Sequence, residues 1–212
     1  MDARSVIVVI LAYGLWGTSK RSPKEIVGYG MYLNECANAL RHLAACGYGV
    51  NVVFCGGATD EEGKTEAQSM FAYMADVVTR CAGSFFLEEE SLTTPANIWQ
   101  AYKRIANLVP EPGSPDRHVI FLCDAAREFK VRWLVSQWQR QARNMENRSC
   151  RRSWSPLRSI ISWPKPEILA FNRPDITHKS TKVFQFFETM VMVLAPWILQ
   201  KRISKIRETE GV

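Results

Sequence analysis

The segment VIVVILAYG, residues 6–14, decides the fold class, because it is an uninterrupted apolar run closed by a glycine. Branched apolar residues without polar alternation are typical of a strand buried on both faces, as in a parallel sheet. We therefore expect a first strand over Val6–Leu11. Its carboxyl end at Tyr13-Gly14 either lets the backbone approach a ligand or makes a plain turn.

Three further units repeat this pattern of a short apolar run followed by an amphipathic segment. The predicted strands span Val50–Cys55, Ser84–Leu87 and Val119–Cys123. The predicted helices span about residues 33–44, 65–81, 95–108 and 124–144, the first of them after a loop that reaches Tyr29. We expect Gly47 and Gly83 to end the first two helices. We expect Thr94 to cap the third, with Pro95 at its first position.

Four consecutive strand–helix units predict an α/β protein whose parallel sheet is covered by helices on both faces. The length of 212 residues suits a single domain over 1–212 that carries a C-terminal appendage. We expect a fifth strand in Ser159–Trp163 or Ile168–Phe171, within a basic loop that begins near residue 145. A helical extension over about 181–207 closes the chain.

The composition is typical of a globular protein, with 47% hydrophobic and 23% charged residues. The six cysteines form no C-x-x-C pair, so we expect reduced thiols in a cytoplasmic protein and no zinc or redox site. No secretory signal is recognised before Val6. Gln185, Glu188 and Pro196 interrupt the apolar stretch Val183–Leu199, which favours a buried or partner-facing helix over a membrane span.

The net charge of +6 is concentrated in one block. From Arg127 to Arg158 there are nine basic residues and only two acids, Glu128 and Glu146. Such a block could contact phosphates or an anionic surface, or it could be a solvated helix face and loop. The interleaved aromatic and glycine residues of a nucleic-acid module are missing, so we do not expect nucleic acid as a partner.

Polar residues follow each predicted strand, where ligands bind in open parallel sheets. Consecutive Gly56-Gly57 predict a nest of N–H groups for an anion. Glu66 either stabilises the positive end of the next helix or acts as a hydroxyl acceptor or general base. The candidate ligand-binding residues are Tyr13, Gly14, Gly56, Gly57, Glu88, Glu89, Ser91, Thr94, Asn97, Arg127 and Lys130. The candidate catalytic residues are Glu66 and Asp124, and no metal ligand is predicted.

Two of these connections allow more than one interpretation. Asp124, Arg127 and Lys130 are spaced by three, so they form either an ion pair that holds the helix or a phosphate clamp with Arg127 as its fork. The acids at 88–90 are either solvated or bind ribose hydroxyls or an amine. Ser91 and Thr94 place hydroxyls where an oxyanion could bind. No dinucleotide, P-loop or hydrolase motif occurs, and the histidines lack metal or triad spacing.

Taken together, these connections resemble one family, the YdcF/SanA-like bacterial domain of unknown function. Phe54-Cys55-Gly56-Gly57 is similar to that family's strand followed by Ser-Gly-Gly. Thr65-Glu66-Ala67 with Met70 is similar to its Ser-Glu-Ala-x-x-Met. The most specific element is Glu88-Glu89-Glu90-Ser91 with Thr94 and Asn97, which resembles acidic-x-Ser-x-x-Thr-x-x-Asn.

The resemblance covers about residues 5–140 and implies a three-layer αβα, Rossmann-like fold with a polar pocket lined by these connections. Some relatives are thought to bind S-adenosylmethionine. This chain has Ala12-Tyr13-Gly14 where the family has Gly-Gly-Gly, and no membrane anchor of the kind many relatives carry is recognised. It has Arg127 and Lys130 where the family has His and then Arg, which removes the best acid–base group near neutral pH.

Three functions therefore stay open, in order of preference. The first is a hydrolase or transferase acting on a nucleotide-like or phosphorylated small molecule, with Glu66 or Asp124 as base and Arg127 stabilising charge. The second is a module that binds a nucleotide or S-adenosylmethionine without chemistry, which the missing histidine favours. The third is an interaction protein that contacts an acidic partner or a membrane surface through the basic region and the C-terminal helix.

Overall fold

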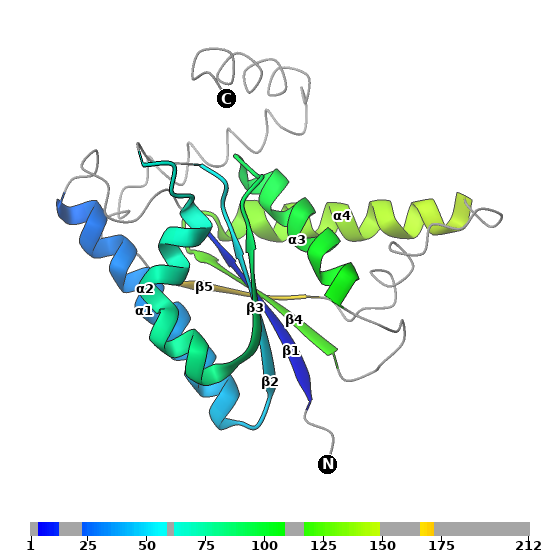
Figure 1. The fold of residues 1–212 in the computed structure, drawn as a ribbon. Coiled ribbons are helices and arrows are strands. Elements are labelled where there is room, and N and C mark those ends of the chain that lie inside the picture. Colours follow the sequence, from blue (N-terminus) through cyan, green and yellow to red (C-terminus); the bar gives the residue numbers. More distant parts are fainter. Residues whose placement is uncertain (1–3, 13–22, 59–61, 109–116, 149–165, 172–212) are drawn as a thin grey trace.

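The structure is a computed structural model that describes residues 4–12, 23–58, 62–108, 117–148 and 166–171. Strands and helices alternate along these residues (Figure 1). The elements are β1 (Ser5–Leu11), α1 (Pro23–Ala45), β2 (Gly49–Cys55), α2 (Glu66–Cys81), β3 (Ala82–Glu88), α3 (Thr94–Leu108), β4 (Arg117–Asp124), α4 (Glu128–Arg148) and β5 (Glu167–Phe171). Tyr13, Gly14, the strand expected at Ser159–Trp163 and the C-terminal helix lie outside the described residues.

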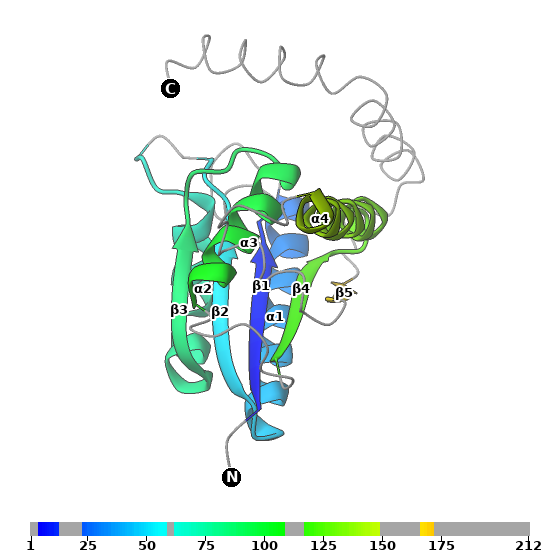
Figure 2. The same cartoon turned by 90° about the vertical axis from the view of Figure 1, so that its right-hand side faces the viewer.

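The five strands form one parallel sheet in the order β3-β2-β1-β4-β5 (Figure 2). This arrangement confirms the predicted α/β, Rossmann-like fold class, and β5 confirms the strand expected at Ile168–Phe171. The first strand lies at the centre, where Val8 pairs with Val52 on one side and Ile120 on the other. The chain adds β2 and β3 on one side of β1 and then returns to add β4 and β5 on the other side. This change of side creates a topological switch point between β1 and β4.

Helices cover both faces of the sheet, with α1 and α2 on one face and α3 and α4 on the other (Figure 1). The apolar run of β1 divides between two cores because alternate side chains point to opposite faces. Val6, Val8 and Ile10 pack against α1 and α2, whereas Ile7 and its neighbours at two-residue spacing pack against α3 and α4. Burial on both sides explains why the strand sequence contains no polar alternation.

The boundaries of α1 and α2 each differ from the sequence prediction at one glycine-containing segment. Helix α1 begins at Pro23, so the predicted loop reaching Tyr29 is too long. Tyr29 itself is completely buried, and its packing overrides the low helix propensity of the neighbouring glycines. Gly83 does not end a helix but lies within β3, which follows α2 directly. The prediction for Gly47 is confirmed, because its φ of 81° places it in the left-handed conformation that closes α1.

The third and fourth helices also begin differently from the prediction. Thr93, rather than Thr94, caps α3, since its hydroxyl accepts a hydrogen bond of 3.3 Å from the Ala96 amide. Asp124 is the last residue of β4 rather than the start of a helix, and α4 begins at Glu128. Within the described ranges, no helix combines the length and apolarity needed to cross a bilayer, and the cysteines are free thiols.

Candidate functional site

All nine buried polar or charged side chains of the described residues lie at the carboxyl edge of the sheet. They fall into three groups of three, one for each of the connections that follow β2, β3 and β4. The groups are Thr65, Glu66 and Ser69; Glu88, Ser91 and Asn97; and Asp124, Arg127 and Lys130. Ionisable side chains are rarely buried unless they are paired or functional, so this concentration marks the edge as the candidate site.

The group after β4 is built around a buried ion pair. Asp124 is completely buried, and the Arg127 Nε donates to its carboxylate. The Arg127 Nη1 donates to the Ala12 carbonyl at 2.6 Å, and Nη2 lies 3.4 Å from the Leu11 carbonyl. Burial, the largest single cause, would lower the Arg127 pKa, but Asp124, Tyr32 and Cys123 together outweigh it and hold the pKa above its usual value. Of the two interpretations of this connection, the ion pair is present between Asp124 and Arg127.

Arg127 and Tyr32 of α1 both donate hydrogen bonds to backbone carbonyls at the switch point of the sheet. The Tyr32 hydroxyl lies 3.0 Å from the carbonyl of Leu11 at the end of β1 and 3.0 Å from that of Leu122 in β4. Burial raises the pKa of Tyr32 well above its ordinary value, so the phenol stays protonated and serves as a donor. The single hydrogen of Tyr32 serves one of these two carbonyls at a time, and Arg127 supplies further donors where the paths of β1 and β4 diverge.

Gly56 and Gly57 allow the connection after β2 to lie close to the connection after β3. The Gly56 amide donates to the Glu88 carbonyl at 3.0 Å, and the Gly57 amide donates to the Ser91 carbonyl at 2.7 Å. The predicted anion nest is therefore wrong, because both N–H groups already have protein acceptors. A Cβ atom at Gly57 would lie 2.4 Å from the Glu89 carbonyl oxygen, a separation that no ordinary side chain allows. Gly56 and Gly57 serve packing between adjacent strand ends.

Glu66 occupies the first position of α2, beside the end of β1. A Cβ atom at Gly56 would lie 2.7 Å from the Glu66 Oε2 and 2.5 Å from the Ala12 Cβ, so these three residues are in close contact. Thr65 caps the helix by accepting from the Gln68 amide at 3.2 Å. The carboxylate of Glu66 therefore lies at the positive end of α2, where negative charge is stabilised.

The three consecutive acids Glu88, Glu89 and Glu90 at the end of β3 differ in burial and in the helix that they contact. Glu88 is buried rather than solvated. Glu89 accepts a hydrogen bond of 2.7 Å from the Thr65 hydroxyl, which joins this connection to the start of α2. Glu90 accepts one of 2.9 Å from Gln100 on the exposed side of α3. Only Glu90 behaves as a solvated acid.

Glu88, Ser91 and Asn97 form a buried hydrogen-bonded chain. The Glu88 Oε1 accepts from the amides of Glu90 at 2.9 Å and Ser91 at 3.1 Å. The Ser91 hydroxyl meets both the Glu88 Oε2 and the Asn97 Oδ1. The Asn97 Nδ2 lies 3.5 Å from the Cys55 carbonyl at the end of β2. Burial raises the pKa of Glu88 above its ordinary value, although the hydrogen bonds from Ser91 and the two amides oppose this.

The structure brings most of the predicted site residues to this edge. The connections after β2 and β3 are in direct contact, and Ala12 joins them to the Asp124–Arg127 pair. Thr94 lies half-buried in the first turn of α3, whereas Tyr13 and Gly14 lie outside the described residues. In the described part of the chain, no three potential metal ligands gather.

Three polar residues of this edge were not predicted as site residues. Thr65 and Ser69 flank Glu66 on α2, and the helix-capping pattern of Thr65 with Gln68 could have identified the first of them. Tyr32 lies within a helix, and no local signal indicates that its hydroxyl bonds to strand ends.

No family model matches this chain, and no curated protein matches it.

Proposed function

We propose that the carboxyl edge of the sheet binds a small ligand that carries a phosphate or nucleotide group. The nine buried polar side chains on the connections after β2, β3 and β4 carry this proposal. Burying such groups costs stability, so their concentration on three successive connections favours a role beyond folding. The edge is also where open parallel sheets bind ligands.

The charges and helix ends favour a ligand with both an anion and hydroxyl groups. The amino ends of α2, α3 and α4 all lie at this edge of the parallel sheet, and each carries partial positive charge. Lys130 adds a cationic side chain that is 4% exposed. Glu66 offers a carboxylate that could accept a ribose hydroxyl. A nucleotide, or S-adenosylmethionine with its ribose and carboxylate, has this combination of groups.

Glu66 is the favoured base if the ligand is also transformed. The Asp124 carboxylate is completely buried and bound by Arg127, so proton abstraction would have to break that pair. Glu66 lies at the first position of α2, beside the carboxyl end of β1. A hydrolase or transferase would therefore use Glu66, and a binding module would use the same residue only as a hydroxyl acceptor.

Membership of the YdcF/SanA-like family belongs to the same proposal. Its three motifs fall on the connections that hold the buried polar groups after β2 and β3. Contact with a protein or membrane through the basic block and the C-terminal helix stays a prediction, because residues 149–165 and 172–212 lie outside the described part.

A ligand screen with site variants tests the proposal. Nucleotides, S-adenosylmethionine and sugar phosphates are added singly, and unfolding temperature is measured. A ligand at a hundred times its dissociation constant stabilises the folded protein by about 2.7 kcal/mol. We expect Glu66→Gln and Lys130→Met to weaken the response, whereas Glu35→Gln on the exposed side of α1 keeps it. Binding that ignores both site variants would contradict the proposed site.

Mass spectrometry of the ligand after incubation separates the two versions of the proposal. Conversion by the wild type and its loss in Glu66→Gln, at a ligand concentration that saturates the variant, would establish an enzyme. A ligand recovered unchanged after long incubation with the wild type would establish a binding module. If no member of the panel binds, the proposed ligand class is wrong.

A further inference from the structure

The hydroxyl of Ser91 lies between two oxygen atoms that cannot both accept its single hydrogen. One neighbour is the Glu88 Oε2, and the other is the Asn97 Oδ1. A serine hydroxyl donates one hydrogen bond only. If Glu88 were a carboxylate, both neighbours would be acceptors, and one contact would join two oxygens without a hydrogen between them. All three residues are buried, so water is poorly placed to repair the mismatch.

Turning the Asn97 amide around does not solve the problem. The amide nitrogen lies 3.5 Å from the Cys55 carbonyl and is its donor. A flipped amide would place the side-chain oxygen against that carbonyl instead, so one pair of facing acceptors would replace another. The orientation that keeps the amide nitrogen on the Cys55 carbonyl directs the Asn97 oxygen at Ser91, so a second hydrogen is still needed in the chain.

A hydrogen on Glu88 gives each of these contacts one donor and one acceptor. The Oε1 then acts as a carbonyl oxygen that accepts from the amides of Glu90 and Ser91, at 2.9 Å and 3.1 Å. The Oε2–H donates to the Ser91 hydroxyl, Ser91 donates to the Asn97 oxygen, and Asn97 donates to the Cys55 carbonyl. Each donor in this chain has one acceptor, and the two carboxyl oxygens have different roles.

We infer that Glu88 is a neutral carboxylic acid in this structure and that its hydrogen positions the connection between β3 and α3. Glu88 is thus a positioning residue. The Ser91 that it holds also supplies the carbonyl that accepts from the Gly57 amide at 2.7 Å. Through Ser91, the protonation of Glu88 controls how this connection packs against the end of β2. The inference does not depend on which ligand the site binds.

The groups facing Glu88 from the adjoining elements support a neutral acid. From β2 it faces Cys55, whose thiol pKa is raised well above its ordinary value by burial, so this neighbour supplies no positive charge that would stabilise a carboxylate. From its own connection it faces Glu90, whose negative charge also raises the Glu88 pKa. From α3 it faces the uncharged Asn97 through Ser91. Burial is the largest cause of the raised pKa of Glu88.

The sign of the resulting pH dependence is fixed. A carboxyl group whose folded pKa is raised holds more protons in the folded state than in the unfolded state. Its stabilising contribution is fully present below the unfolded value of 4.5 and is lost as the pH rises through the folded pKa. When Glu88 loses its proton, the Ser91 hydroxyl donates to the carboxylate, and the Asn97 oxygen loses its donor. The connection after β3 therefore loosens at a pH above the folded pKa of Glu88.

Urea unfolding of Glu88→Gln and the wild type across this pH range tests the inference. Glutamine has the shape of the neutral acid: its amide donates to Ser91 and its oxygen accepts from the two backbone amides. Between the unfolded and the folded pKa of Glu88, we expect the unfolding equilibrium constant of the wild type to rise relative to that of Glu88→Gln. The rise should reach up to about tenfold per pH unit and stop above the folded pKa. Glu35→Gln should keep the wild-type pH profile. A pH-independent or opposite difference would overturn the inference.

Carbon-13 NMR of the wild type gives an answer even if the variant does not fold. The side-chain carboxyl of Glu88 is assigned through bonds from its own backbone and titrated beside that of Glu35, which is exposed on α1. We expect the Glu88 midpoint to lie above the Glu35 midpoint. A Glu88 midpoint at or below it would show that Glu88 is ionised in the folded protein and would refute the inference.

Discussion

Replacing Arg127 by methionine should be among the most destabilising single changes at the candidate site. The substitution keeps the apolar length of the side chain and removes the guanidinium. It leaves Asp124 as an unpaired charge with no exposed surface. It also removes the 2.6 Å donor of the Ala12 carbonyl at the end of β1.

The expected loss of stability follows from these contacts. Removing one partner of a buried ion pair costs about 3–5 kcal/mol, because the other charge stays buried without compensation. Domains of this kind unfold with about 5–15 kcal/mol in total, so the variant should approach the limit of folding. Replacing both partners, as in Asp124→Leu with Arg127→Met, should cost clearly less than the single change, since no charge is left unpaired.

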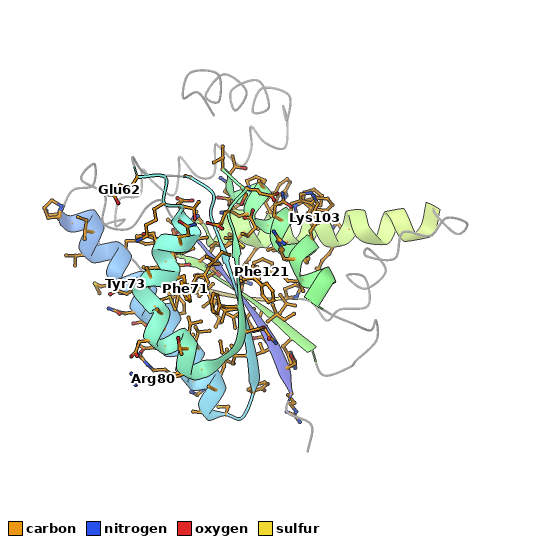
Figure 3. All side chains as sticks on the ribbon, in the orientation of Figure 1. Glu62, Phe71, Tyr73, Arg80, Lys103 and Phe121 are labelled. Atoms are coloured by element: carbon orange, nitrogen blue, oxygen red, sulfur yellow. The ribbon has the colours of Figure 1, made fainter. Side chains whose placement is uncertain are left out.

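Urea unfolding followed by circular dichroism measures these differences. The matched control is Arg80→Met, which breaks the ion pair between Arg80 and Asp76 at the far end of α2 (Figure 3). The two side chains of that pair are 72% and 76% exposed, so its loss should cost no more than about 1 kcal/mol. If Arg127→Met cost as little as Arg80→Met, the argument that Arg127 holds the switch point together would be refuted.

Two further substitutions are expected to act at the same edge, each measured by urea unfolding. Tyr32→Phe removes the donor shared by two strand carbonyls and should cost about 1–3 kcal/mol; wild-type stability would show that these carbonyls need no such partner. Gly57→Ala places a methyl group 2.4 Å from the Glu89 carbonyl oxygen and should cost about 1–3 kcal/mol. Gly49→Ala is its control, because a Cβ atom there would lie 3.9 Å from the Arg4 carbonyl oxygen, and equal effects of the two alanines would contradict the steric argument.

The sequence was sufficient to predict the first four strands and their parallel arrangement, whereas it left the fifth strand open between two segments. Runs such as Val6–Leu11 and Val50–Cys55 are apolar throughout because both faces of a central parallel strand are covered. Helix ends were harder to predict because they depend on packing. The start of α1 was missed since its glycines suggested a loop, whereas buried Tyr29 and Tyr32 hold the segment as helix.

The place of the site could be predicted, but its internal bonds could not. The rule that ligands bind at strand ends selected Glu66, Glu88 and Arg127. The contact between Arg127 and Leu11 joins residues 116 positions apart and depends on β4 pairing with β1 rather than with β3. The burial of Glu88 likewise depends on its register opposite Cys55, and its three-acid sequence gives no sign of it.

The central position of β1 has a consequence for how the chain acquires its structure. Although β1 is made early, its second neighbour is β4, at residues 117–124, and the helices that cover Ile7 and Val9 are α3 and α4. A nascent chain that ends after β3 would therefore present an unpaired strand edge and one bare apolar face. Closing such a long sequence separation slows folding and leaves intermediates prone to aggregation. We expect refolding to be limited by the docking of β4 beside β1, the step that also brings Arg127 to the end of the first strand.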